Sequence, residues 1–314
     1  MDPSPKRAVA IVAGPTASGK SALAVALAEE FAGTIINADS QQVYRDLAVL
    51  TARPGAAEMA RVPHRLYGVI DAAENCSVGR WRALADAEID AALAAGRLPI
   101  LVGGTGLYLE ALLNGLAALP PIPAAAREEA RALHAELGGA AFRDRLAALD
   151  PVGAARLAPG DTQRLTRAYE VVRATGRPLS DWQARQEPGS LRAAAIVLQP
   201  ERDALYRACD ARVERMLAEG AAEEARALLA RQLPAHLPAM KAVGVRELGA
   251  WLDGRMSREQ AVAAMQQATR RYAKRQYTWF RRRLSTDEIL RRVTITEQFS
   301  ASLLSNILSF IRSS

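Results

Sequence analysis

The sequence predicts an α/β fold, in which a P-loop-containing parallel sheet core carries an all-helical insertion domain. The stretch GPTASGKS at 14–21 follows an apolar run and precedes a helical pattern, as the phosphate-binding loop G-x-x-x-x-G-K-[ST] requires. Strand and helix patterns alternate over the first third of the chain. A proline-rich stretch at 119–123 then begins a long segment with only helical patterns. The length of 314 residues is enough for about two domains.

The elements of the core follow from their apolar patterns. Short apolar runs, in part β-branched, predict buried parallel strands at 8–13, 34–38 and 98–102. Apolar residues at helical spacing predict helices at 20–31, at 79–95 and from 107 onward. Strand–helix alternation of this kind is typical of a parallel sheet.

The sequence composition changes after residue 119. The prolines at 120, 121 and 123 cannot continue a helix, and the residues that follow show a helical pattern rich in Ala and Arg. An apolar run at 193–198 then predicts a return to the core, with helices at 203–231 and 257–283. We therefore expect four parts, which are the first part of the core at 1–119, a helical insertion at 120–192, the second part of the core at 193–284 and a C-terminal extension at 285–314. The extension is expected to be amphipathic or frayed.

Composition narrows the class of protein. Cys76 and Cys209 lie far apart, which excludes a disulfide framework and a metal-ligand spacing and favours a reducing, cytoplasmic setting. No run reaches the roughly 18 apolar residues of a membrane span. The short apolar run near the N-terminus leads into the phosphate loop without a signal-peptide cleavage site.

The charge of the chain is concentrated near its end. The formal net charge is +7, and the segment 270–283 alone contains seven Lys and Arg and no Asp or Glu. Four aromatic residues alternate with these cations, namely Tyr272, Tyr277, Trp279 and Phe280. Cations with stacking rings are typical of sites for single-stranded RNA. The alternative is an amphipathic helix with solvated charges and its aromatic side chains in the core.

The phosphate loop is the strongest signal in the sequence. Gly14 and Gly19 allow backbone conformations that direct several N–H groups at one anion, and Lys20 adds a positive charge. The Ser21 hydroxyl is a candidate ligand for Mg²⁺. The residues predicted to bind phosphate are Gly14, Pro15, Thr16, Ala17, Ser18, Gly19, Lys20 and Ser21. Loops of this kind are typical of nucleotide-binding proteins, ATP-binding ones among them, but the loop does not identify the phosphate compound.

Two further positions lie where strands are predicted to end. Asp39 follows the second strand and could be a Mg²⁺-binding acid of a nucleotide hydrolase, a general base, or a turn carboxylate. Thr105, in the stretch Gly-Gly-Thr-Gly at 103–106, follows the third strand, where a nucleotide hydrolase would normally have an acid. That departure counts against ATP hydrolysis. For Thr105 the structural alternative is a hydroxyl that caps a tight strand–helix turn.

These motifs in this order resemble one family, the bacterial tRNA dimethylallyltransferases, also called tRNA isopentenyltransferases. The matching stretches are GPTASGKS (14–21), DSQQVYRDL (39–47), TARP (51–54), PHRL (63–66), LVGGTGLYL (101–109), DTQRLTRAYEV (161–171), KAVGVREL (241–248) and KRQYTWFR (274–281). The resemblance implies transfer of a dimethylallyl group from its diphosphate to the N6 amine of an adenosine beside the anticodon, with pyrophosphate leaving. It further implies a Mg²⁺ cofactor, a monomer, and a helical insertion that binds the anticodon stem-loop of tRNA.

The resemblance also implies roles for individual residues. It makes Asp39 the general base, places Thr105 near the reacting atoms, and assigns a pyrophosphate contact to Arg212, with Arg215 as the alternative alignment. Arg127 is carried over by spacing alone. The residues implied to bind tRNA are Asp39, Ser40, Gln41, Gln42, Thr105, Arg127, Gln163, Arg164, Leu165, Thr166, Arg167, Lys241, Arg246, Lys274, Arg275 and Arg281.

Three other functions compete with this one. A small-molecule kinase would bind ATP in the loop and use Asp39 as its base, but it leaves the basic helix and the insertion unexplained. A relative that prenylates free adenine nucleotides would share the core and lack the parts that hold RNA. A non-enzymatic RNA-binding module would leave the phosphate loop unexplained. Turnover of ATP to ADP without a prenyl donor would favour the kinase.

Overall fold

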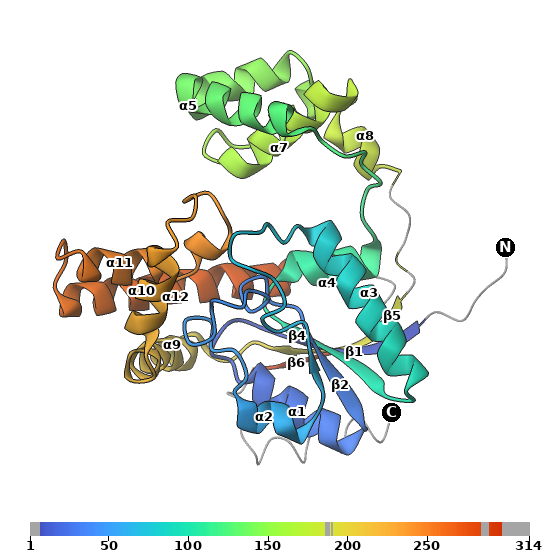
Figure 1. Ribbon diagram of the computed structural model, residues 1–314. Coiled ribbons are helices and arrows are strands. Elements are labelled where there is room, and N and C mark those ends of the chain that lie inside the picture. The colour runs from blue at the N-terminus through green and yellow to red at the C-terminus, as the bar shows by residue number, and fades with distance from the viewer. Residues whose placement is uncertain (1–6, 186–188, 190, 284–288, 297–314) are drawn as a thin grey trace, which may run out of the picture. The chain divides into compact units, whose positions relative to one another are not determined.

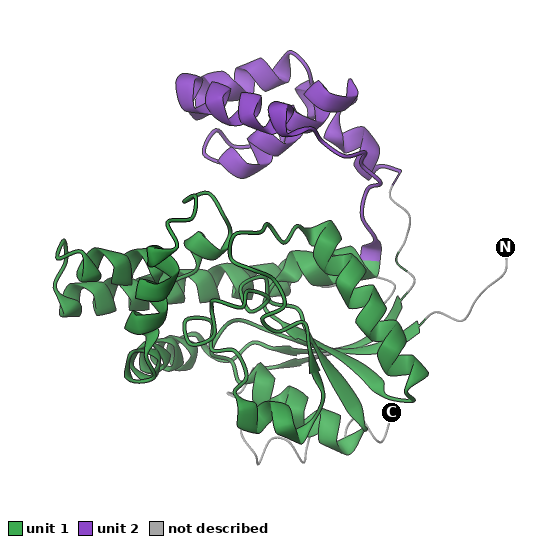
Figure 2. Ribbon diagram, viewed as in Figure 1, with its two compact units in different colours: residues 1–113, 189–314 green, residues 114–188 purple. Residues whose placement is uncertain are grey.

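The computed structural model describes residues 7–185, 189, 191–283 and 289–296 (Figure 1). The chain forms two compact units (Figure 2), of which the first comprises residues 1–113 and 189–314 and the second residues 114–188. The sequence placed the limits of the insertion at 120 and 192, so the structural limits lie a few residues earlier at both ends. No described helix is long and apolar enough to cross a membrane.

The first unit is built on a six-stranded parallel sheet with the strand order β3-β2-β4-β1-β5-β6. Its strands are β1 (Arg7–Ala13), β2 (Gly33–Asn37), β3 (His64–Arg65), β4 (Leu98–Gly103), β5 (Leu191–Leu198) and β6 (Ile289–Ile295). In the central register, Ile11 of β1 lies opposite Leu101 of β4 and Ala195 of β5. The predicted α/β fold with a parallel sheet is confirmed.

Helices cover both faces of this sheet, which is why its central strands β1 and β4 are mostly apolar. On one face α1 (Lys20–Glu30) packs Leu23 and Leu27 against Val12 and Ile100. On the other face lie α3 (Val78–Ala94) and α4 (Gly106–Asn114), in a core cluster that contains Ile11 and Leu101 (Figure 1). Residues of α10 (Ala221–Ala230), α11 (Val245–Leu252) and α12 (Arg258–Arg283) belong to the same cluster. The short helix α2 (Ala56–Arg61) follows the segment that leaves β2.

The C-terminal half of the first unit differs from expectation in two places. The helix predicted at 203–231 divides into α9 (Arg202–Ala218) and α10 (Ala221–Ala230), because Gly220 adopts a left-handed conformation with φ of 98°. Residues 289–295, expected to be amphipathic or frayed, form β6 and pair in parallel with β5. The remaining elements are the 3-10 turn η1 (Ala239–Lys241), α11 (Val245–Leu252) and α12 (Arg258–Arg283).

The second unit is all-helical. It contains α5 (Ala124–Ala147), α6 (Pro151–Ala155), α7 (Thr162–Thr175) and α8 (Leu179–Gln183). Its small core packs Phe142 of α5 against Leu165 and Tyr169 of α7. The Asp161 carboxylate caps the start of α7 by accepting the N–H of Arg164, and a left-handed glycine ends the helix.

Candidate active site

The phosphate loop connects β1 to α1 at the carboxyl edge of the sheet. Gly19 (φ 88°) and Ala17 (φ 63°) both adopt left-handed conformations, and Gly14 has a φ of 153°. A Cβ atom on Gly14 would lie 2.6 Å from the carbonyl oxygen of Leu198, so only glycine fits there. The loop therefore presents backbone rather than side chains, and Ala17 is buried against α9 and α12.

Two cations lie beside one another at this loop, one from the loop itself and one from α9. Lys20 begins α1, and its ammonium group donates to the carbonyl oxygen of Pro15 at 3.1 Å. Burial lowers the pKa of Lys20 to about 8; the positive charge of Arg212 acts in the same direction, and the negative charge of Asp39 opposes both. Arg212, from α9, donates to the Thr16 hydroxyl at 2.7 Å. Burial likewise lowers the pKa of Arg212.

The two arginines that the sequence left as alternatives are distinct in the structure. Arg212 is half-buried and contacts the phosphate loop, whereas Arg215, one helical turn further along α9, is exposed. The Nε atom of Arg212 and the buried hydroxyl of Ser18 have no hydrogen-bond partner among the described residues. The loop thus contains polar groups that an anion could pair.

Asp39 lies just beyond the end of β2, on a rigid support. The Asn37 side chain accepts the N–H of Asp39 at 2.8 Å and donates to its carbonyl oxygen at 3.0 Å. Trp81 of α3 in turn donates to the carbonyl oxygen of Asn37 at 2.9 Å. The Asp39 carboxylate accepts the N–H of Gln41 at 2.9 Å. Asp39 is therefore a turn carboxylate, as one of the alternatives expected. Its second carboxylate oxygen is not used in this turn and is available for a chemical role.

Thr105 connects the ends of β2 and β4. Its hydroxyl accepts the N–H of Ser40 at 2.9 Å and donates to the Ser40 hydroxyl at 3.3 Å, and its own N–H donates to the carbonyl oxygen of Ala38 at 3.2 Å. The expected capping hydroxyl thus joins two loops instead of capping a helix. A Cβ atom on Gly103 would lie 2.0 Å from the Ala38 oxygen, which explains that glycine by close packing.

Sequence reasoning did not assign two side chains of α12 that reach this site. Tyr272 contacts Thr105; burial raises the pKa of its phenol, and the negative charge of Asp39 raises it further. Gln276 is buried and contacts both the phosphate loop and the residue after Gly103. Their position in the middle of a basic helix gave no signal of this role.

The segment after Asp39 is held by side chains from elsewhere. The carboxylate of Glu224, on α10, accepts the backbone N–H groups of residues 48–50 at 2.7 to 2.8 Å. The Gln42 amide donates to the carbonyl oxygens of Thr51 and Ala52 at 2.9 and 3.0 Å. Gln42, assigned to tRNA, thus also fixes the loop that carries the site.

The other residues assigned to tRNA fall into two groups. In the first unit, Lys241, Arg246 and the α12 residues Lys274, Arg275 and Arg281 are exposed. In the second unit, Arg127, Gln163 and Arg164 are exposed, and Thr166 and Arg167 are half-buried. Leu165 is a correction: its side chain is fully buried in the core of the second unit, so it stabilises α7 and cannot contact RNA.

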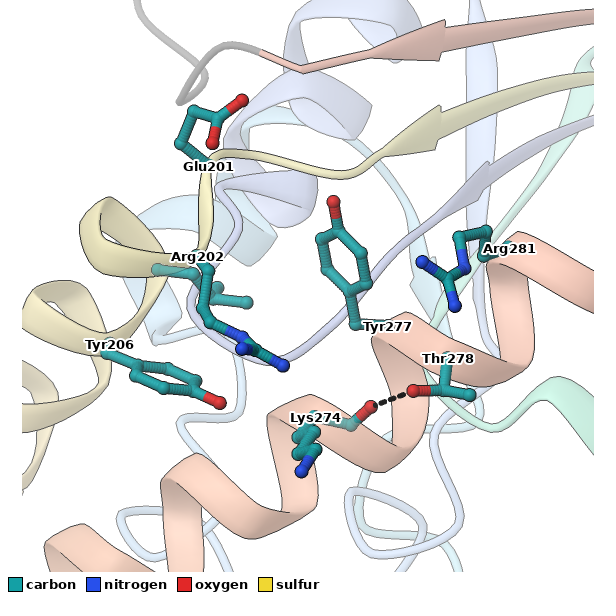
Figure 3. A pocket seen from close by; sticks show the side chains of 8 residues that line it. Glu201, Arg202, Tyr206, Lys274, Tyr277, Thr278 and Arg281 are labelled. Atoms are coloured by element: carbon teal, nitrogen blue, oxygen red, sulfur yellow. Dashed lines mark hydrogen bonds between the residues drawn. The ribbon is translucent and has the colours of Figure 1, made fainter.

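A cavity of about 360 Å³ lies between the start of α9 and the C-terminal half of α12 (Figure 3). It is lined by Glu201, Arg202, Leu205, Tyr206, Lys274, Tyr277, Thr278 and Arg281. The Arg202 guanidinium lies 5.9 Å from the centre of the Tyr206 ring. A second hollow of about 520 Å³ follows the next face of α12 and contains five cations beside Trp279.

The aromatic side chains of α12 divide between the core and a cavity. Phe280 is fully buried, and a Cβ atom on Gly106 would lie 2.3 Å from the Trp279 ring, so these rings also pack the core. Tyr277 lines the cavity. Within the described ranges, no group of three or more His, Cys, Asp or Glu side chains is placed to hold a metal ion.

Comparisons with known proteins agree with this geometry. A family model described as IPP transferase matches residues 42–283, and one described as isopentenyl transferase matches residues 7–75. The tRNA dimethylallyltransferase of Rhodospirillum centenum is 58% identical over 282 residues, which cover 89% of this chain and 90% of the relative. That of Rhodospirillum rubrum is 54% identical over 306 residues, which cover 96% and 93%.

Solved structures are similar over nearly the whole chain. The crystal structure of a tRNA isopentenylpyrophosphate transferase from Bacillus halodurans has 34% identity and a TM-score of 0.70, covering 98% of this chain and 96% of that one. A eukaryotic dimethylallyltransferase acting on tRNA has 26% identity and a TM-score of 0.81, covering 98% and 80%.

Proposed function

We propose, since the chain belongs to the IPP transferase family of tRNA dimethylallyltransferases, that it transfers a dimethylallyl group from dimethylallyl diphosphate to tRNA. The acceptor is the exocyclic N6 amine of the adenosine 3′ of the anticodon, at tRNA position 37, and the products are N6-(dimethylallyl)adenosine in tRNA and pyrophosphate. The observation that carries the proposal is the joint placement of the phosphate loop, Arg212 and Asp39 at one edge of the sheet, with glycines and a threonine where a hydrolase has its acid.

The phosphate loop would hold the diphosphate of the donor. Ser18 and Arg212 offer buried polar atoms that lack a partner in the described structure, and a phosphate oxygen would pair them. Burial of the Lys20 ammonium disfavours its charged form, so a nearby phosphate anion would stabilise that form. The same groups stabilise the negative charge that develops on the departing pyrophosphate, so they lower the barrier to breaking the allylic C–O bond.

Members of the family use a divalent metal, and we assign Mg²⁺ to this chain. The described residues fit an ion that is held mainly by phosphate oxygens, because Mg²⁺ needs only one or two protein ligands and a hydroxyl lies at the first turn of α1. Ser21, at the first turn of α1, would supply a hydroxyl. When bound, the metal neutralises charge on the diphosphate.

Asp39 would be the general base. The adenine amine is a weak nucleophile, because its lone pair is delocalised into the ring. As the bond from N6 to the allylic carbon forms, the C–O bond breaks, pyrophosphate leaves with the electron pair, and the Asp39 carboxylate accepts the proton from N6. The bonds from Asn37 and Trp81 fix the backbone that carries Asp39, and the N–H of Gln41 orients its carboxylate for this transfer.

RNA would be held by exposed cations in both units. Arg127, Gln163 and Arg164 belong to the helical unit, which we assign to the anticodon stem-loop. Arg202 and Tyr206 join the α12 cations in the cavity of Figure 3, where a phosphate and a stacked base would both find partners. The loop, Asp39 and the basic helix all come from one unit of one chain, which supports a monomer.

Labelled dimethylallyl diphosphate, Mg²⁺ and an anticodon stem-loop with an adenosine-rich 3′ side test the proposal. Label is expected in the RNA, and unlabelled pyrophosphate should be released in equal amount. Label in free AMP but not in the RNA would overturn the tRNA assignment. Conversion of ATP to ADP without the prenyl donor would support a kinase instead.

A further inference from the structure

The side chain of Gln276 connects two loops that are far apart in the sequence. Its Oε1 atom accepts the N–H of Thr16, in the phosphate loop, at 2.8 Å. Its Nε2 atom donates to the carbonyl oxygen of Gly104, after β4, at 2.9 Å. The residue is only 6% exposed. Both ends of a buried carboxamide are therefore paired, and removal of either hydrogen bond would leave a buried backbone group without its partner.

The neighbouring backbone is shaped to admit this carboxamide. A Cβ atom on Gly104 would lie 2.0 Å from the Nε2 atom of Gln276 and 3.3 Å from the carbonyl oxygen of Gly14. Any side chain at 104 would displace Gln276. The second glycine of the Gly-Gly-Thr-Gly stretch is therefore needed to make space for the Gln276 side chain, and not only to form the turn.

Thr16 is held from two helices at once. Arg212 of α9 donates to its hydroxyl at 2.7 Å, while Gln276 of α12 accepts its N–H. The Thr16 N–H and hydroxyl are consequently both paired, which fixes this residue of the loop without a ligand. A loop fixed in this way loses less conformational entropy on binding.

The same helix carries exposed cations beside Gln276. Lys274 and Arg275 are exposed, and α12 is one continuous helix from Arg258 to Arg283. A shift or rotation of α12 when RNA engages these cations would move the Gln276 carboxamide, and with it Thr16.

We propose that Gln276 is a positioning residue that holds the phosphate loop in its binding conformation and couples RNA binding on α12 to diphosphate binding. The coupling rests on the proposed function, since it requires both ligands. Positioning of the loop does not, because it concerns the diphosphate alone.

The test compares Gln276→Met with Gln266→Met. Both substitutions replace a glutamine of α12 by a side chain of similar length, but Gln266 donates to Glu214 of α9, at 3.3 Å, instead of to the loops of the site. The dissociation constant of inorganic pyrophosphate with Mg²⁺ is measured by calorimetry, with and without the anticodon stem-loop. Without RNA, Gln276→Met is expected to weaken pyrophosphate binding about tenfold or more, while RNA binding alone changes less than about twofold.

The effect of RNA on pyrophosphate binding then tests the coupling. In the unchanged chain, RNA should tighten pyrophosphate binding at least about fivefold, and in Gln276→Met this gain should disappear. An equal loss in Gln266→Met, or pyrophosphate affinity unchanged in Gln276→Met, would overturn the positioning role. Absence of any RNA effect in the unchanged chain would overturn the coupling. The transfer assay decides the proposed function separately, since pyrophosphate binding involves no transfer.

Hydrogen exchange gives a measurement that needs no variant. The Thr16 amide is expected to exchange slowly in the unliganded protein, because Gln276 accepts its hydrogen. Exchange of this amide as fast as that of an unprotected loop amide would contradict the proposed hydrogen bond, even if Gln276→Met failed to fold.

Discussion

Replacing Asp39 by Asn separates its chemical role from its structural one. The Asn side chain keeps an oxygen that accepts the N–H of Gln41, and the backbone bonds to Asn37 are unaffected. The fold should therefore be retained, with a stability change within about 0.5 kcal/mol. An amide, however, cannot accept the proton from N6. We expect kcat for transfer to fall about a hundredfold to ten-thousandfold, which raises the barrier by about 2.7 to 5.4 kcal/mol.

The assay is single-turnover transfer of labelled dimethylallyl to the stem-loop, with pyrophosphate binding measured in parallel. A control is Asp71→Asn, because Asp71 lies outside the site and also accepts the N–H of the residue two positions later, Ala73, at 2.8 Å. This substitution additionally removes the ion pair of Asp71 with Arg231, so it is the more severe structural change. Its transfer rate should stay near that of the unchanged chain. A rate within tenfold of normal in a well-folded Asp39→Asn protein would refute the general-base assignment. An equal loss of rate in both variants would mean that the effect comes from a disturbed turn and not from the loss of a base.

Three further outcomes follow from the structure. Since the pKa of Lys20 is lowered to about 8, its charge is lost as pH rises through that value, so pyrophosphate affinity should fall above about pH 8, and Lys20→Met should remove this dependence. Replacing Lys274, Arg275 and Arg281 by Ala should weaken stem-loop binding and reduce the slope of log K against log salt by about 0.7 for each phosphate that is no longer neutralised, as a salt titration would measure. Unchanged binding would mean that these three side chains are solvated surface charges without a role in RNA binding. Leu165→Ala should destabilise the helical unit by about 2–5 kcal/mol in a denaturant titration, whereas a loss of RNA affinity at unchanged stability would reverse its assignment to the core.

The phosphate loop and Asp39 could be predicted from the sequence because their information is local. A glycine-rich loop between a strand and a helix, and a carboxylate at a strand end, are each contained in a few residues. Gln276 could not be predicted in this way, since its two partners lie 260 and 172 residues away. Arg212 and Arg215 are equivalent in a short alignment, and only the direction of the helix face separates them.

Two expectations from the sequence were wrong, one for the C-terminal strand and one for Leu165, and both have physical reasons. The strand β6 contains two arginines, Arg291 and Arg292, so its sequence does not resemble the apolar runs of the central strands, and it takes the edge of the sheet. Leu165 was carried over with its polar neighbours, although the helical spacing of Leu165, Ala168, Tyr169 and Val172 predicts a buried face.

The sheet order has a consequence for synthesis on the ribosome. One neighbour of β1 is β5, and the chain between them, residues 14–190, includes the whole helical unit. At about 5–20 residues per second, β1 waits on the order of ten to thirty seconds for this partner. During that time β1 lacks β5 on one edge, whereas the helical unit is contiguous in sequence and can close its core without residues made later. The nascent phosphate loop is thus complete in sequence early, but it gains Arg212 only after about two thirds of the chain has been made, and Gln276 only when synthesis is nearly finished.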